Sequence, residues 1–285
     1  MSKSNAIKTF RDLLSFLTII PLAQTEEFVL TSARNMFLFP LMGAFIGGFA
    51  ALYYLGAGFA VSNLFLLANS YVGFPSGLLL QVFGSAALSV MTLAFLLVFE
   101  GFQHFDGLVD LGNAIGLKGV EDRREIAHRW VVTYKGAFLA MFVEFSAFAG
   151  LFLLNWSFWG IALRALVVAE VCAKVAMVTI VWRGKAAHAG LGSRFISHAK
   201  RRMNVAAYIS GLVVSYLLLG LAGVLVVVAA FLLGLFMKWV GDRVFGGVSG
   251  DMIGATNEAA RALTLVLVAV IGLLVSGLLW GGLLL

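Results

Sequence analysis

Long runs of apolar residues alternate with short polar stretches along this chain, and the runs are long enough to cross a membrane. No Asp, Glu, Lys or Arg occurs between Arg34 and Glu100. Because roughly 20 helical residues span a bilayer core about 30 Å thick, this interval holds two membrane-spanning helices. The same pattern predicts seven spans in all, near residues 35–60, 76–99, 136–155, 158–182, 205–220, 222–239 and 260–282.

The first 20 residues follow a different pattern. Apolar residues recur there at helical spacing, with charged residues between them: Ile7, Phe10, Leu13, Leu14 and Leu17. This alternation is typical of an amphipathic helix that lies in the membrane interface. We therefore expect residues 1–20 to form an interfacial helix rather than a span or a signal peptide.

The composition agrees with a membrane protein. Of the 285 residues, 61% are hydrophobic and 12% are charged, whereas a soluble domain carries about 25% charged residues. This balance excludes a soluble globule, a disordered chain and a secreted disulfide scaffold, and the single Cys172 cannot form a disulfide within the chain. We predict an all-α fold, a polytopic membrane helical bundle in which residues 1–285 form one integral membrane domain.

The basic residues lie mostly on one side of the predicted spans. The turns near residues 61–75, 156 and 221 contain no Lys or Arg, whereas the stretches 100–135 and 183–204 are rich in both. By the positive-inside rule this basic side is cytoplasmic, which we take to be the cytoplasmic side of the plasma membrane. The net charge of +6 fits attraction to an anionic lipid bilayer. Nucleic-acid binding is not expected, because no soluble domain presents a groove.

One acidic cluster follows the second predicted span. Asp106, Asp110 and Asn113 are spaced i, i+4, i+7, so a helix aligns them on one stripe. Two carboxylates and an amide oxygen are hard ligands that suit Mg²⁺ or Mn²⁺. The alternative is that the two aspartates pair with Arg123 or Arg124 and only cap the membrane end of the span.

Other charged residues lie within or beside the apolar runs. Glu100 and His104 form a second i, i+4 pair, which could meet the aspartates if the helix breaks at Gly101. Charged groups inside a span usually face the bundle and pair with one another. We therefore expect Glu170 and Lys174, also four residues apart, to form an ion pair.

A glycine-rich segment near residues 241–258 contains the second acidic cluster. Gly250 precedes a predicted helix, where backbone N–H groups can bind phosphate. Asp251 and Glu258 are seven residues apart on one helical stripe, with the small Gly254 between them. The alternative is a loop in which Asp251 caps the helix and Glu258 is an ordinary charge of its first turns.

The two basic stretches supply candidate phosphate ligands, namely Arg124, Lys135, Arg183, Lys185 and Arg194. Metal-binding carboxylates, a glycine turn and cationic loops together suit phosphoryl transfer, which depends mainly on positioning and charge neutralisation. The residues alone thus indicate metal-dependent phosphotransfer, or ion coordination, at the cytoplasmic membrane surface.

Three segments of the chain carry a resemblance to a known family. HFDGLVDLGN at 104–113, GLGSRF at 190–195 and GGVSGDMIGATNE at 246–258 resemble the signature regions of cobalamin synthase, also called adenosylcobinamide-GDP ribazoletransferase. The similarity extends in order over most of the chain. The family usually continues its first motif with a third acid, where this chain has Asn113.

The resemblance implies a multi-pass, Mg²⁺-dependent enzyme of late cobalamin assembly. The partners it implies are adenosylcobinamide-GDP and α-ribazole or its 5′-phosphate, whose ribose hydroxyl attacks phosphorus while GMP leaves. The residues that it assigns to the metal and to catalysis are Asp106, Asp110 and Asp251, with His104 in catalysis and Glu258 as a further metal ligand.

Two other functions fit parts of the pattern. A CDP-alcohol phosphotransferase carries a D-x-x-D-G-x-x-A-R run, which this chain lacks. An ion-coupled transporter would place its acids at the bilayer midplane within internal repeats, whereas these acids lie at span ends and no clear repeat occurs. Assembly into a homo-oligomer is left open.

Overall fold

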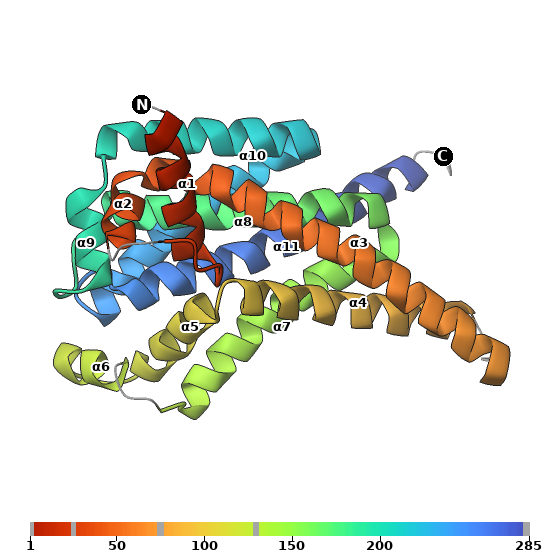
Figure 1. The fold of residues 1–285 in the computed structure, drawn as a ribbon. Coiled ribbons are helices and arrows are strands. Elements are labelled where there is room, and N and C mark those ends of the chain that lie inside the picture. The colour runs from red at the N-terminus through yellow and green to blue at the C-terminus, as the bar shows by residue number, and fades with distance from the viewer. Residues whose placement is uncertain (1–2, 24–26, 73–76, 128–130, 282–285) are drawn as a thin grey trace.

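The computed structural model describes residues 3–23, 27–72, 77–127 and 131–281, and these parts of the chain are helical (Figure 1). The helices are α1 Lys3–Leu17, α2 Phe28–Arg34, α3 Phe39–Val72, α4 Gly77–Phe99, α5 Gln103–Ala114, α6 Val120–Ala127, α7 Tyr134–Ser157, α8 Trp159–Arg183, α9 Leu191–His198, α10 Asn204–Val244 and α11 Gly250–Gly281. Short 3₁₀ turns cover Met36–Leu38 and Arg201–Met203. The predicted all-α membrane bundle is confirmed.

Six of the described helices are long and apolar enough to span a bilayer. They cover Met36–Tyr71, Gln81–Phe99, Tyr134–Ser157, Trp159–Arg183, Asn204–Val244 and Gly250–Ser276. The predicted count of seven is not confirmed, because the segments 205–220 and 222–239 belong to the single helix α10. Two boundaries also differ from the prediction: α3 continues to Val72 rather than ending near 60, and α11 begins at Gly250 rather than near 260.

Helix α10 reverses its direction at Gly220. The backbone there has φ 58° and ψ −135°, which is not helical and which glycine adopts without a Cβ clash. Beyond the turn, Gly223 lies directly against the backbone of Ser215. The rings of Tyr208 and Phe231, one from each arm, are 5.6 Å apart. The two arms of α10 therefore lie side by side, with the break at the predicted boundary between the two segments.

Helix α8 forms the centre of the bundle, and α3, α10 and α11 pack around it. Its side chains from Ala165 to Val181 are nearly all buried. Small residues on the surrounding helices allow close approach. A Cβ on Gly47 of α3 would lie 2.6 Å from the Cα of Val167, and one on Gly211 of α10 would lie 2.7 Å from Val175.

The predicted amphipathic helix is present as α1, which crosses the direction of the spanning helices at one end of the bundle (Figure 1). Its residues Leu13, Leu14 and Leu17 are buried. Phe16 packs against Phe195 of α9, with ring centroids 5.0 Å apart. The apolar face of α1 thus covers part of the protein, and its location in a membrane interface stays a prediction.

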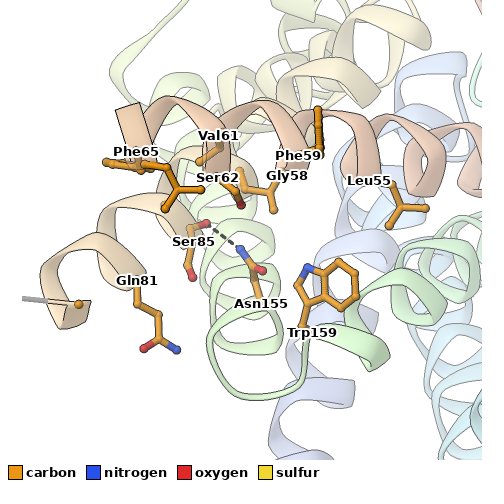
Figure 2. A pocket seen from close by; sticks show the side chains of 14 residues that line it. Leu55, Gly58, Phe59, Val61, Ser62, Phe65, Gln81, Ser85, Asn155 and Trp159 are labelled. Atoms are coloured by element: carbon orange, nitrogen blue, oxygen red, sulfur yellow. Dashed lines mark hydrogen bonds between the residues drawn. The ribbon is translucent and has the colours of Figure 1, made fainter. Parts of the chain in front are cut away.

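A pocket of about 660 Å³ opens between α3, α4 and the turn from α7 to α8 (Figure 2). Its walls are mainly apolar, and the Asn155 side chain donates a hydrogen bond to the carbonyl of Ser85 at 3.2 Å. None of the described residues that line it is acidic, basic, His or Cys. Acid–base or metal chemistry must therefore lie elsewhere.

Candidate active site

The chain breaks between α4 and α5, and this break brings two predicted residues together. Gly101 has φ 70° and Phe102 has φ 58°, so two successive residues are left-handed. For Phe102 this conformation costs about 1–2 kcal/mol. The break occurs at the predicted position, and it places His104 Nδ1 3.3 Å from the Glu100 carboxylate.

A cavity of about 410 Å³ lies where the three motif-bearing segments meet. It is lined by Phe16, Gln103, His104, Asp106, Met177, His188, Ala189, Gly190, Leu191, Gly250, Asp251, Ile253 and Gly254. Asp106 comes from the first turn of α5 and Asp251 from the first turn of α11. The two acidic clusters, far apart in the sequence, therefore share one cavity.

Glycines allow this convergence. A Cβ on Gly254 of α11 would lie 3.0 Å from the Cα of His104, and one on Gly107 of α5 would lie 3.0 Å from the N of Ala255. Side chains at these positions would force α5 and α11 apart. The glycines of both motifs thus set the distance between the helices that carry Asp106 and Asp251.

The loop before α9 is fixed to the start of α11 in the same way. A Cβ on Gly192 would lie 2.6 Å from the carbonyl oxygen of Val248. The Val248 N–H donates to Lys185 O at 2.7 Å, and the Ala187 N–H donates to Val248 O at 3.1 Å. The GLGSRF and GGVSGD segments therefore form one unit beside the cavity.

The three aspartates interact electrostatically. Burial, together with the smaller effect of the negative charges of Asp251 and Asp106, raises the pKa of Asp110 from 3.8 to about 7. Ser249 donates a hydrogen bond to the Asp251 carboxylate at 3.2 Å. Carboxylates that repel one another are a donor set that fits a hard divalent cation.

Beneath the cavity lies a buried ion network that the sequence predicted only in part. Lys174 Nζ lies 2.5 Å from Glu100 and 3.2 Å from Glu170, which confirms the predicted i, i+4 pair. It also donates to the side-chain oxygen of Asn257 at 2.8 Å. Arg261, which is 1% exposed, forms ion pairs with Glu100, Glu170 and Glu258.

This network contains the tightest group of ligand-type atoms in the described residues. One ligand atom each from Glu100, His104 and Glu258 lie within 4.8 Å of one another. Arg261 already binds the carboxylates of Glu100 and Glu258, so a metal ion there would have to compete with a guanidinium. The structure thus places Glu258 in the ion network rather than beside Asp251. The sequence indicated the ion network only through charged residues that lie inside apolar spans.

The structure gives Asn113 a different role from the predicted metal ligand. Its amide oxygen accepts hydrogen bonds from the Thr133 N–H at 2.9 Å and the Thr133 hydroxyl at 2.7 Å. Its amide nitrogen donates to Val131 O at 2.7 Å. Both ends of the amide therefore fix the turn before α7, next to Gly136. The prediction that Asn113 ligates a metal does not agree with this geometry.

Arg124 is likewise held by the protein itself. Its Nε and Nη2 donate to the carbonyl of Phe245 at 3.0 and 2.8 Å. Arg123 donates to Arg243 O at 2.9 Å in the same way. Helix α6 thus caps the last carbonyls of α10, and neither arginine is among the described residues that line the cavity.

The remaining predicted phosphate ligands lie at different places. Lys135 donates to Ile115 O at 3.3 Å, at the end of α5. Arg183 lines a separate pocket at the end of α8. Lys185 and Arg194 are exposed on the segments that flank the cavity loop. Gly250 lines the cavity itself. The structure therefore brings Gly250 to the acidic centre, and Lys185 and Arg194 to its neighbourhood.

Comparison with known sequences gives the family. The sequence profile of cobalamin-5-phosphate synthase matches residues 9–270, which include all three motif segments. The chain belongs to the cobalamin-5-phosphate synthase family. The resemblance noted in the motifs is thus confirmed over nearly the whole chain.

Curated relatives agree with this family. An adenosylcobinamide-GDP ribazoletransferase of Methanocella arvoryzae is 33% identical over 68% of this chain and 81% of its own length. One of Halorubrum lacusprofundi is 30% identical over 91% of this chain and 95% of its own. One of Methanosarcina barkeri is 26% identical over 92% and 91%. No solved structure matches the chain.

Proposed function

We propose that this chain joins α-ribazole, or its 5′-phosphate, to adenosylcobinamide-GDP and releases GMP, as a membrane-embedded Mg²⁺-dependent transferase of late cobalamin assembly. Its family and the names of its curated relatives support this reaction. The observation that carries the proposal is the cavity in which Asp106 and Asp251 meet.

The proposed metal ligands are Asp106, Asp110 and Asp251. Burial is the main cause of the raised pKa of Asp110, and repulsion from Asp251 and Asp106 adds to it; a bound divalent cation would relieve that repulsion. When bound, Mg²⁺ or Mn²⁺ would neutralise charge on the phosphates and polarise the attacked phosphorus. The ion network is a weaker candidate, because Lys174 and Arg261 already neutralise its carboxylates.

The chain itself supplies the positioning. Gly250 lies at the first turn of α11, where helix N–H groups and the helix dipole favour a phosphate. His104 lines the cavity and is oriented by its hydrogen bond to Glu100. Lys185 and Arg194 are placed to attract the anionic diphosphate from the surrounding solution. We place this cavity on the cytoplasmic side of the plasma membrane, where the basic residues gather.

The decisive experiment measures GMP release by the purified protein supplied with adenosylcobinamide-GDP, α-ribazole 5′-phosphate and Mg²⁺. Asp106→Asn and Asp251→Asn should each abolish turnover without preventing membrane insertion. Asp122→Asn is the matched control, since Asp122 is exposed on α6 and should retain the full rate. Folded wild-type protein that releases no GMP with any of several divalent metals would refute the transferase. Full activity in both aspartate variants would refute the metal site alone.

A further inference from the structure

One face of α10 marks where the protein meets lipid on its basic side. In the second arm, Val228, Leu232, Phe236 and Trp239 are exposed, and their spacing of four, four and three residues puts them on one stripe. The stripe ends at Arg243, whose guanidinium lies 5.4 Å from the centre of the Trp239 ring. An exposed apolar stripe that ends in Trp and Arg is typical of the membrane interface.

The end of α8 shows the same combination at the same level. The Arg183 guanidinium lies 5.7 Å from the centre of the Trp182 ring. The Trp182 ring packs against Tyr208, from the first arm of α10, with centroids 5.6 Å apart. Aromatic and basic residues from α8 and both arms of α10 thus gather where these helices reach the headgroup region.

A pocket of about 390 Å³ opens within this group of residues. Its described lining is Trp182, Arg183, Gly184, Leu235 and Lys238. It therefore has two cations from different helices, an aromatic wall and an apolar floor. None of these residues lines the cavity that holds Asp106 and Asp251, so the pocket is separate from the proposed active site.

The charge of the pocket suits an anion. Lys238 Nζ lies 2.7 Å from the Asp242 carboxylate, and this pair leaves Lys238 partly exposed. Arg183 and Arg243 add two further positive charges, so the four side chains together carry a net charge of about +2. A guanidinium binds phosphate through two parallel hydrogen bonds, and an ammonium adds a point charge.

We propose that this pocket binds the phosphate of an anionic phospholipid headgroup. Arg183 and Lys238 would hold the phosphate, and the acyl chains would lie along the exposed stripe from Phe236 to Leu232. A lipid is favoured over a soluble phosphate because the pocket lies at the ends of α8 and α10, beside the exposed apolar stripe that includes Leu232 and Phe236. Basic pockets between spanning helices on the cytoplasmic side are suited to such headgroups.

The test uses the full chain in phosphatidylcholine nanodiscs with increasing fractions of phosphatidylglycerol, and it measures lipid retained by the protein in native mass spectrometry. Each basic residue near an anionic surface contributes about 1 kcal/mol, or about 5-fold in affinity. Arg183→Gln and Lys238→Gln should each weaken phosphatidylglycerol retention about 5-fold, and the double variant about 25-fold. Lys200→Gln with Arg202→Gln removes the same charge from exposed positions outside the pocket and should change retention less than 2-fold.

A charge-preserving pair keeps the test decisive if the double variant does not fold. Arg183→Lys with Lys238→Arg should retain phosphatidylglycerol within about 3-fold of wild type. Equal retention by the pocket variant and the Lys200 and Arg202 control would overturn the proposal. So would retention that does not distinguish phosphatidylglycerol from phosphatidylcholine. Displacement of the lipid by inorganic phosphate at equal concentration would show a soluble-anion site and would overturn the lipid assignment.

Discussion

The contact of Gly192 with the start of α11 controls the width of the proposed active site, and Gly192→Ala tests this. The added Cβ would lie 2.6 Å from Val248 O, whereas ordinary contact begins at 3.4 Å. The first turn of α9 must therefore move by about 0.8 Å relative to Gly250 and Asp251. Misplacement of about 1 Å at a reacting centre can lower a rate by about 100-fold. We expect the turnover number for GMP release to fall by that order.

The stability change should be much smaller than the rate change. Overpacking costs about 1–3 kcal/mol, while replacing a helical glycine by alanine returns up to about 1 kcal/mol. Thermal unfolding in detergent should therefore show a loss of no more than about 2 kcal/mol. Gly56→Ala is the matched control, because a Cβ there meets no atom within 4 Å. The reasoning fails if Gly192→Ala turns over at the wild-type rate, or if Gly56→Ala loses activity equally.

Three further predictions follow from individual contacts. Metal-free protein should lose stability as pH rises through about 7, because the folded state binds the Asp110 proton more tightly than the unfolded chain does. Thermal melts should show that Mg²⁺ reverses this loss. Lys174→Met should lower the free energy of unfolding by about 3–5 kcal/mol, since the buried Glu100 loses a partner. Arg124→Gln should lower stability by about 1–2 kcal/mol without raising KM, because its bonds go to Phe245 O.

For each of these three predictions, a second variant or measurement distinguishes the proposed cause from a nonspecific loss of stability. Asp110→Asn should flatten the pH dependence of metal-free stability. Glu170→Gln combined with Lys174→Met should regain part of the lost stability, because one of the stranded carboxylates is removed. If Arg124→Gln raises the KM for adenosylcobinamide-GDP 10-fold or more, Arg124 binds the substrate and the structural role is wrong.

The sequence predicted the membrane bundle and the alignment of Asp106 with Asp110 for physical reasons that act along one helix. Apolar length identifies a span, and the i, i+4 spacing put Asp106 and Asp110 on one stripe. Gly101 indicated a break that could bring the Glu100–His104 pair to the aspartates, and beyond this break His104 lines the cavity with Asp106. The Glu170–Lys174 pair followed from the cost of a lone charge in an apolar span.

The sequence could not assign residues whose partners lie on other helices. A guanidinium can donate to a phosphate or to a backbone carbonyl, so the sequence alone could not assign Arg124, whose partner lies at the end of α10. The amide of Asn113 faces the turn before α7, which no spacing within α5 reveals. Arg261 pairs with three glutamates from different helices or segments. In the sequence, nothing distinguishes it from the other basic residues.

The reversal of α10 at Gly220 determines which side of the membrane this part of the chain touches. Roughly 16 residues lead from Asn204 to the turn, a rise of about 24 Å, which is less than the thickness of the hydrocarbon core. No Asp, Glu, Lys, Arg or His occurs between Arg202 and Lys238, so the hairpin carries no charged loop across the bilayer. The hairpin as a whole begins and ends on the basic side, next to Arg202 and Lys238. A water-soluble reagent applied from the opposite side should therefore leave a cysteine placed at the turn unmodified.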